Sequence, residues 1–215
     1  MGIVTIPYKP RPLQRAIHER LKRFNLLVIH RRAGKTVLAI NQLIKWVMTC
    51  THDRPRGAYI APLYRQAKSI AWDYLQHYCR PIPGAEFNQA ELRVDLPGGA
   101  RIQLFGADNP DSLRGLYFDG VVIDEVAQIS PSLFPEIIRP AIADRMGAVL
   151  FLGTPKGRNY FHDLYMDVRN NEDWLVEVHR ASETGIIDPD ELAAARASMS
   201  EDLYQQEFEC SWSAA

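Results

Sequence analysis

The sequence predicts an α/β fold in which a mainly parallel sheet is flanked by helices, and three observations support this. Apolar segments of strand length alternate with segments of helical periodicity along most of the 215 residues. Several strands, such as 26–30 and 148–152, are continuous apolar runs, which is typical of parallel strands buried on both faces. The first of these strands passes through Gly34-Lys35-Thr36 into a helix, so that strand, turn and helix form one unit.

The N-terminal half begins with an amphipathic helix, because Leu13, Ile17 and Leu21 recur every fourth residue between basic side chains. Alternating residues on both sides of Pro97-Gly98-Gly99 predict a hairpin. The elements expected here are helix 13–21, strand 26–30, helix 35–48, strand 58–61, helix 65–78 and the paired strands 91–96 and 100–105.

The C-terminal half starts with a loop rich in Gly, Asp and Asn over residues 106–120. A helix expected over 132–143 contains Pro140, which should bend it. The other elements expected are strand 121–123, strand 148–152, helix 160–169, strand 174–179 and helices 189–198 and 201–209.

Composition and charge exclude several classes of protein. No apolar run approaches the length needed to span a bilayer, so no membrane partner is expected. Cys50, Cys79 and Cys210 fit neither a disulfide framework nor a zinc site, which favours a reducing cytoplasm. Lys and Arg dominate residues 9–35, whereas Asp and Glu dominate 163–209. This asymmetry fits a head-to-tail ring of subunits and equally fits two solvated surfaces.

The turn Gly34-Lys35-Thr36 is the strongest functional signal. At a helix start, backbone N–H groups and the positive end of the helix dipole face an anion. Lys35 can reach the β- and γ-phosphates of a nucleotide, and the hydroxyl of Thr36 can bind Mg²⁺. The full motif has a glycine where Ile29 stands, so a chance Gly-Lys-Thr at a helix start is the alternative.

Asp124 and Glu125 follow the apolar strand 121–123 and fit the second half of a nucleotide-hydrolysing site. Asp124 can hold Mg²⁺ through water, while Glu125 can orient and deprotonate the attacking water. A strand-end cap is the alternative for either residue. Their place after the Gly-Lys-Thr turn in an alternating α/β chain favours hydrolysis, and a glutamate base favours ATP-driven motors.

Thr154 follows the last strongly apolar strand, within Gly153-Thr154-Pro155. A polar residue at this position can sense the γ-phosphate and report hydrolysis to the segments that follow. The alternative is an ordinary turn, because glycine and proline both favour one.

Taken together, these motifs resemble the ATPase domain of the large terminase subunit of tailed bacteriophages. The resemblance covers residues 10–212, and the missing first glycine is a property of this family. It implies a P-loop NTPase fold of the ASCE type, with an ATPase core at 1–178 and a small helical lid or linker at 179–215. The residues that carry it are Pro12-Leu13-Gln14, His30 to Thr36, Ala61-Pro62, Gln66-Ala67, Ser112 to Gly115, Val122 to Glu125 and Gly153 to Gly157.

The resemblance also implies roles around the nucleotide. Gln14 matches the glutamine that reads adenine, the alternative being a polar residue on the helix surface. Arg31 matches an arginine that contacts the γ-phosphate in cis, and Arg32 would brace the loop. Ala33 and Gly34 would contribute backbone to the phosphate cradle.

Arg114 matches an arginine finger that is supplied to the ATP of a neighbouring subunit. The alternative for Arg114 is a salt bridge to Asp108 or Asp119. Thr154 matches the motif that couples hydrolysis to movement.

The function implied is Mg²⁺-dependent ATP hydrolysis that translocates double-stranded DNA into a procapsid in the host cytoplasm. The partners implied are DNA bound without regard to sequence, a homo-oligomeric ring (a pentamer in this family), the portal protein and the small terminase subunit. No nuclease domain is visible, so nuclease activity is expected to be absent. Candidate DNA contacts are Arg11, Arg15, Arg20, Lys22, Arg65 and Lys68.

Two other functions remain open at this point. A DNA or RNA helicase of the Asp-Glu-x-x class shares the sheet, but it needs a second motor-like domain within one chain. A nucleotide-binding assembly switch without turnover is the other, and Glu125 argues against it.

Overall fold

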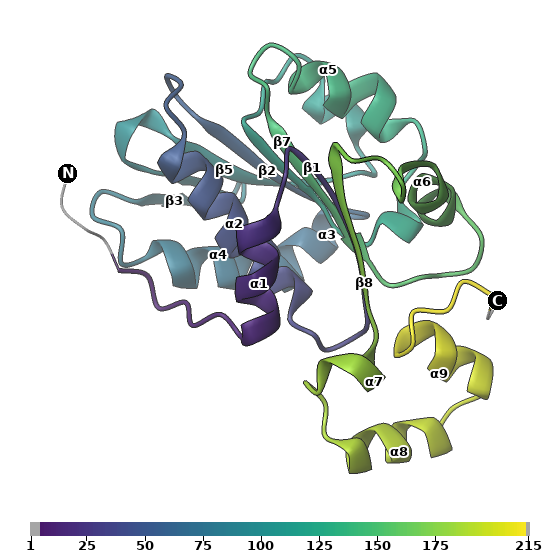
Figure 1. Cartoon of the computed structure of the whole chain (residues 1–215). Helices are drawn as coiled ribbons and strands as arrows, with labels where there is room; N and C mark the ends of the chain where they lie inside the picture. The colour runs from purple at the N-terminus through teal and green to yellow at the C-terminus, as the bar shows by residue number, and fades with distance from the viewer. Residues whose placement is uncertain (1–4, 214–215) are drawn as a thin grey trace.

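The chain forms a single mixed sheet in a computed structural model that describes residues 5–213. Parts of the two expected units, 1–4 and 214–215, lie outside the described residues. The sheet has eight strands in the order β3-β4-β5-β2-β6-β7-β1-β8 (Figure 1). The strands are β1 (Phe24–Ile29), β2 (Arg56–Ala61), β3 (Glu86–Asn88), β4 (Arg93–Asp95), β5 (Arg101–Gly106), β6 (Gly120–Ile123), β7 (Ala148–Gly153) and β8 (Trp174–His179).

The helices are mostly short. They are α1 (Pro12–Arg20), α2 (Lys35–Thr49), α3 (Tyr64–Gln66), α4 (Trp72–Cys79), α5 (Arg139–Ala141), α6 (Tyr160–Val168), α7 (Ala181–Thr184), α8 (Pro189–Ala197) and α9 (Glu201–Glu207). Helix α1 precedes the first strand, α7 to α9 follow the last one, and the others lie between strands. Turns of π-helix precede α4, over Ala67–Ala71, and α5, over Phe134–Ile138.

The predicted parallel sheet is confirmed for six of the strands. Strands β5, β2, β6, β7, β1 and β8 are parallel to their neighbours in that run, and β3, β4 and β5 pair antiparallel. The expected hairpin is therefore present as β4 and β5. Because parallel strands share a direction, the six carboxyl ends lie at one edge of the sheet.

Helices cover both faces of the sheet, as alternation along each strand requires. Leu27 and Tyr59 belong to a core shared with α1, α2 and α4. Leu26, Val28 and Phe151 point to the opposite face and pack with α6 and the segment around α5. The molecule thus has three layers, and Figure 1 shows α1, α2 and α4 on one side of the sheet and α6 on the other.

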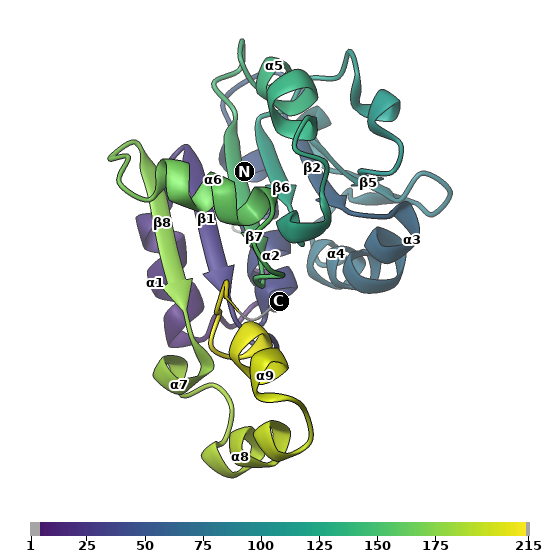
Figure 2. The ribbon, with the colours of Figure 1, turned by 90° about the vertical axis from the view of Figure 1, so that its right-hand side faces the viewer.

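The last three helices lie beyond the carboxyl end of β8, as Figure 2 shows. Two backbone hydrogen bonds attach the end of α9 to the rest of the chain. The N–H of Ala181 donates to the carbonyl of Phe208 over 2.8 Å, and the N–H of Arg31 donates to Glu207 over 2.9 Å. These helices therefore stand over the same sheet edge as the turn after β1. We refer to α7, α8 and α9 together as the lid.

Two expected helices differ from the structure. The helix predicted over 65–78 is divided by the π-helical turn at Ala67–Ala71. The one predicted over 132–143 consists of a π-helical turn at Phe134–Ile138 and one turn of α-helix ending at Ala141, next to Pro140. The short elements β3 and α7 were not predicted. No helix among residues 5–213 is both long and apolar enough to traverse a bilayer.

Candidate active site

Three sequence motifs meet where β1, β7 and β6 end side by side. Strand β7 lies between the other two, with Val28 opposite Gly153 and Phe151 opposite Ile123. The Gly-Lys-Thr turn follows β1, Thr154 follows β7, and Asp124 and Glu125 follow β6. The parallel register thus brings segments that are distant in sequence to one point of the sheet edge.

The turn after β1 has the backbone of a phosphate loop. Arg32 and Gly34 both adopt left-handed conformations, with φ of 66° and 85°. A side chain at position 34 would also clash, since its Cβ would lie 2.9 Å from the Nε2 of Gln14. Helix α2 begins at Lys35 and directs its first N–H groups to the sheet edge, where an anion would be stabilised.

Lys35 and Thr154 are in direct contact. The Nζ of Lys35 donates to the Oγ1 of Thr154 over 3.0 Å and to the carbonyls of Ile29 and His30 over 3.4 Å each. The hydroxyl of Thr154 donates to the carbonyl of Ile29 over 3.0 Å. The ammonium group and the predicted sensing threonine therefore form one buried network with the end of β1.

Asp124 is buried and makes two side-chain hydrogen bonds. Its Oδ1 accepts the N–H of Glu125 over 2.9 Å, and its Oδ2 accepts the phenol O–H of Tyr59. Burial raises the pKa of the Asp124 carboxyl, and the bond from Tyr59 and the charge of Lys35 offset this only in part. The positive charge near Asp124 is therefore too small to compensate for burying its ionised carboxylate.

Glu125 occupies a strained backbone position, with φ and ψ both at 50°. Burial and the charge of Asp124 raise its pKa, while Lys35 and Arg31 lower it. Its carboxyl lines a cavity of about 50 Å³ together with Arg31, Thr154 and residues of α9. Such a space admits a few water molecules beside the carboxyl.

The residues present fit a magnesium ion. Carboxylate and hydroxyl oxygens are the ligands that this cation prefers, and Asp124 and Thr36 supply one of each. Both groups are close to Tyr59, which donates a hydrogen bond to Asp124 and whose pKa the side chain of Thr36 acts to lower. A divalent cation near Asp124 would also supply the positive charge that this buried carboxylate lacks.

Arg31 faces the lid. Its Nε lies 2.5 Å from the Oε2 of Glu207 on α9, and its side chain is 66% exposed. Arg32 is also exposed, and the carbonyl of Ala33 accepts a hydrogen bond from Arg11 over 3.4 Å. Arg31 is thus placed beside the cavity at Glu125, whereas bracing by Arg32 stays a prediction.

Gln14 is buried and connects α1 to the phosphate loop. Its Oε1 accepts the backbone N–H of Arg11 over 2.9 Å, and its Nε2 donates to the carbonyl of Gly34 over 3.2 Å. The alternative of a surface residue is therefore wrong, since only 5% of Gln14 is exposed. Adenine reading by this amide stays a prediction.

Arg114 lies apart from the site of its own chain. It pairs with Asp111, with 2.9 Å between Nε and Oδ1, and it is exposed. The predicted alternative partners are incorrect, because Asp108 accepts the N–H of Tyr64 and Asp119 pairs with Arg145. Supply of Arg114 to a neighbouring subunit stays a prediction.

Sequence reasoning missed three residues of the site. Tyr59 resembles an ordinary core residue of a strand, and Glu207 one more acid in a charged helix. His30 is fully buried, with Nδ1 2.6 Å from the carbonyl of Arg31 and Nε2 2.8 Å from the Oγ1 of Thr184. A carbonyl only accepts, so Nδ1 carries the proton and Nε2 accepts from Thr184. Burial lowers the pKa of His30, which favours this neutral ring.

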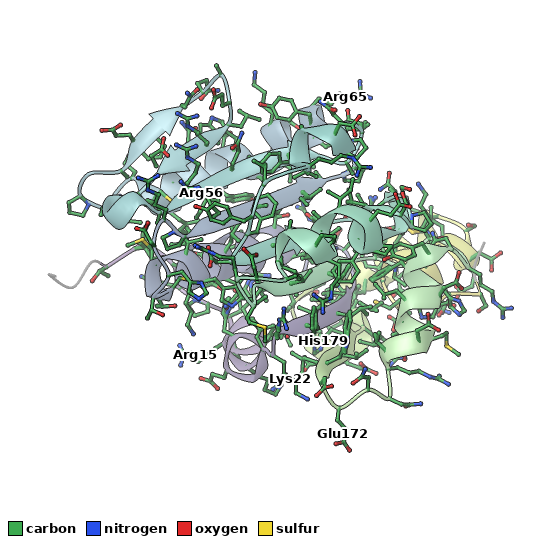
Figure 3. The ribbon with its side chains drawn as sticks, turned by 90° about the horizontal axis from the view of Figure 1, so that it is seen from above. Arg15, Lys22, Arg56, Arg65, Glu172 and His179 are labelled. Carbon is green, nitrogen blue, oxygen red and sulfur yellow. The ribbon has the colours of Figure 1, made fainter. Side chains whose placement is uncertain are left out.

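The opposite charges of the two ends of the chain are partly paired within it. Arg20 pairs with Glu177 over 2.8 Å and Arg31 with Glu207 over 2.5 Å, while Lys22 donates only to the backbone carbonyl of Glu172. Figure 3 shows Lys22 on the same side as Glu172, whereas Arg65 lies at the far side of the molecule from Arg15. The candidate DNA contacts therefore do not form a single surface. Some of the charged side chains at the two ends of the chain pair with each other and are not available to a neighbouring subunit.

Comparison with known proteins gives one consistent result. The family model described as "Terminase large subunit, T4likevirus-type, N-terminal" matches residues 26–214. A large terminase subunit of Thermus phage G20c is 31% identical over 180 residues, covering 74% of this chain and 36% of that protein. The chain thus spans little more than a third of the length of this curated relative.

Two solved structures share the fold. The ATPase domain of the large terminase of Thermus phage P74-26 has a TM-score of 0.79 at 23% identity, covering 96% of this chain and 95% of that domain. The large terminase of another thermophilic bacteriophage, in complex with ADP, has a TM-score of 0.75 at 17% identity, covering 89% of this chain and 49% of that one.

Proposed function

Because this chain belongs to the family of large terminase subunits, we propose that it is the ATPase motor unit of a DNA-packaging machine. It hydrolyses ATP and uses the energy to translocate double-stranded DNA into a procapsid in the host cytoplasm. The observation that carries the proposal is the convergence of Lys35, Glu125 and Thr154 at one edge of the sheet.

The nucleotide would bind against the start of α2. The backbone of Ala33 and Gly34 and the N-terminus of α2 face its phosphates, and Lys35 neutralises the β- and γ-phosphates. Lys35 now donates to Thr154, so a phosphate that engages the ammonium group changes this contact. Thr154 is thereby able to respond to the presence of the γ-phosphate. ADP is bound in the second of the two solved structures named above, which supports nucleotide binding at this fold.

Glu125 is the general base of the proposed reaction. It orients the attacking water and takes its proton, and a pKa raised by burial and by Asp124 makes it a stronger base than an exposed glutamate. The strained backbone at Glu125 fixes the direction of its side chain. Such positioning matters because phosphoryl transfer depends mainly on geometry and charge stabilisation.

Thr36 and Asp124 would hold Mg²⁺. The ion, when bound, neutralises charge on the phosphate oxygens. Thr36 provides its hydroxyl from the first turn of α2, and Asp124 provides a buried carboxylate from the end of β6.

Two arginines would act on the same nucleotide from different chains. Arg31 neutralises the γ-phosphate in cis, and to do so it leaves Glu207, which frees one attachment of α9. Arg114 is exposed and away from its own site, as a finger for a neighbour must be. Such fingers contribute roughly 10³–10⁵ in rate. The active form is accordingly a homo-oligomeric ring, with a pentamer as the form expected.

The other proposed partners are double-stranded DNA bound through its phosphates, the portal protein and the small terminase subunit. Membership of the terminase family does not favour the helicase-like alternative. A nucleotide switch without turnover differs from the motor in a single measurable property, the steady release of phosphate.

Phosphate release in the presence of Mg²⁺-ATP tests the proposal, measured against protein concentration with and without DNA. The rate per chain should rise with concentration, because Arg114 acts only after assembly. Lys35→Ala should abolish turnover, and Lys45→Ala, on the same helix but away from the turn, should leave it unchanged. Stoichiometric binding of ATP without turnover at any concentration would support the switch and contradict the motor.

A further inference from the structure

Tyr59 lies beside the two side chains assigned to magnesium above. It lies on β2 and only 1% of it is exposed. Its phenol O–H donates to the Oδ2 of Asp124, and the side chain of Thr36 is near enough to lower the pKa of the phenol. One buried oxygen therefore contacts a carboxylate from β6 close to the start of α2.

The sheet register places Tyr59 where it can make these contacts. Tyr59 is the register partner of Val122, and Asp124 follows two residues later on the same face. The backbone N–H of Asp124 donates to the carbonyl of Ile60 over 2.9 Å, which fixes the end of β6 against β2. That face packs against α2, whose first turn carries Thr36.

A purely structural role does not account for the phenol group. Phenylalanine would fill the same volume in this core without bringing a polar group into it. The hydroxyl instead donates to the carboxylate of Asp124, a residue that is 5% exposed. The other carboxylate oxygen of Asp124 accepts the N–H of Glu125, so each of the two oxygens has one fixed donor. Both bonds together restrict the carboxylate to a single orientation.

We propose that Tyr59 is a positioning residue of the magnesium site, which fixes the direction of Asp124 without contacting the nucleotide. This inference rests on the proposed function, because it presupposes that Asp124 and Thr36 bind Mg²⁺. Groups that orient metal ligands typically contribute roughly 10–100-fold to metal affinity. Loss of the phenol hydroxyl should therefore weaken the effect of Mg²⁺ on nucleotide affinity. It should leave the contacts between the nucleotide and the turn after β1 intact.

The test compares Tyr59→Phe with the parent and with Tyr78→Phe. Tyr78 is also buried on the α2 side of the sheet, but it lies on α4 and its ring packs against Tyr8, away from the site. ADP affinity is measured by calorimetry in EDTA and in excess Mg²⁺, and the ratio of the two dissociation constants gives the metal dependence. In Tyr59→Phe this ratio should fall about tenfold or more, while the affinity in EDTA should change less than about twofold. Tyr78→Phe should keep both values.

The results separate this inference from the function on which it rests. A parent chain that does not bind ADP would contradict the proposed function. A parent with clear metal dependence that Tyr59→Phe retains in full would overturn the role of Tyr59 alone. Equal losses in EDTA and in Mg²⁺ would also overturn it, because they indicate a structural defect.

A double variant covers the case in which Tyr59→Phe does not fold. Tyr59→Phe combined with Asp124→Asn removes the charge of the buried carboxylate together with the phenol that donates to it. The double variant therefore contains no buried carboxylate that has lost its hydrogen-bond donor. Its metal dependence should equal that of Asp124→Asn alone, since Tyr59 acts through Asp124. A further tenfold loss in the double variant would show that Tyr59 acts independently and would overturn the proposal.

Discussion

Two buried aspartates lie at the two ends of strand β6 and have opposite electrostatic environments. Asp119 precedes the strand and Asp124 follows it, and 8% and 5% of them are exposed. Both accept several hydrogen bonds. They differ in the charge of their donors, and the difference separates a carboxylate that is neutralised within the chain from one that is not.

Asp119 is neutralised within the chain. Arg145 donates to both of its oxygens over 3.1 Å, His52 lies 2.6 Å from Oδ1, and the N–H of Arg56 donates over 2.8 Å. Burial acts to raise its pKa, but these bonds outweigh burial and the pKa is lowered. Cys50 and His52 also place ligand atoms within 4.8 Å of Asp119. The guanidinium of Arg145 already occupies this carboxylate, so the cluster is an ion-pair network that joins three loops.

Asp124 accepts bonds only from neutral donors in the described part of the chain, the phenol of Tyr59 and the N–H of Glu125. Its pKa is raised, so ionised Asp124 costs stability. At Asp119 the free-energy cost of burying a charge is offset by charged side chains of the same chain. At Asp124, at the other end of β6, this cost is left for a ligand to offset.

Glu125→Gln should have the largest effect, a loss of ATP hydrolysis, and it tests the Asp124 end of β6 in this comparison. The amide keeps the size of the side chain but cannot accept a proton, so hydrolysis should fall about 10³-fold. Nucleotide binding and the melting temperature should remain near those of the parent. Phosphate release and calorimetry measure both quantities, and Glu136→Gln, at an exposed position in the π-helical turn before α5, is the control. Turnover within tenfold of the parent would remove Glu125 as the base.

Asp119→Asn should have the next largest effect, on stability alone. Removing the charge leaves Arg145 partly buried without its partner, which should lower the free energy of unfolding by about 3 kcal/mol. For a chain of this size the melting temperature should fall by roughly 6–12 °C. Asp111→Asn, at an exposed pair, is the control and should change the free energy by less than about 0.5 kcal/mol. If folded Asp119→Asn molecules lost ATP hydrolysis, the contrast between Asp119 as a structural residue and Asp124 would be wrong.

Asp124→Asn should do the reverse and stabilise the chain by about 1 kcal/mol when no nucleotide is added. The pKa of Asp124 is higher folded than unfolded, so the folded chain binds the extra proton between these two values. The free energy of unfolding of the parent should therefore fall as pH rises through this window, and the gain from the substitution should vanish below the unfolded pKa. Urea unfolding at pH 4 and pH 7 measures this. A destabilised variant at pH 7 would mean that Asp124 is structural like Asp119.

Arg114→Ala should have the smallest effect on the isolated chain, because its pair with Asp111 is exposed. The free energy of unfolding should change by less than about 0.5 kcal/mol. ATP hydrolysis by the assembled form should be lost, and mixing with Lys35→Ala chains, which retain Arg114, should partly recover it. Normal hydrolysis by an assembled Arg114→Ala protein would remove this residue as the finger.

Much of the fold was predictable, because strands buried on both faces and amphipathic helices leave strong periodic patterns. The positions of Lys35, Asp124 and Thr154 followed from the same reasoning, since parallel strands end at one edge. The π-helical turn at Ala67–Ala71 was not predictable, because the apolar residues of 65–78 fit an ordinary α-helical period, and only the structure shows that Ile70 and Tyr74 are exposed.

The missed site residues have a common physical cause. Tyr59, His30 and Glu207 act through partners that are distant in sequence, and no local pattern marks such a contact. The internal pairing of some of these charges was missed for the same reason. Arg20 and Glu177 are far apart in the sequence and adjacent in space, so part of the charge asymmetry is paired within the chain, while the ring stays a prediction.

The position of β7 between β1 and β6 makes the chain unequally tolerant of insertions and deletions. The segment over residues 107–119 tolerates such changes only at its exposed positions, because Leu113 and Phe118 within it are buried in the core. One residue removed from β7 would turn Thr154 to the opposite face and carry it away from Lys35, even with every ladder bond restored. The length of β7, more than its composition, therefore decides whether Thr154 can reach the ammonium group of Lys35.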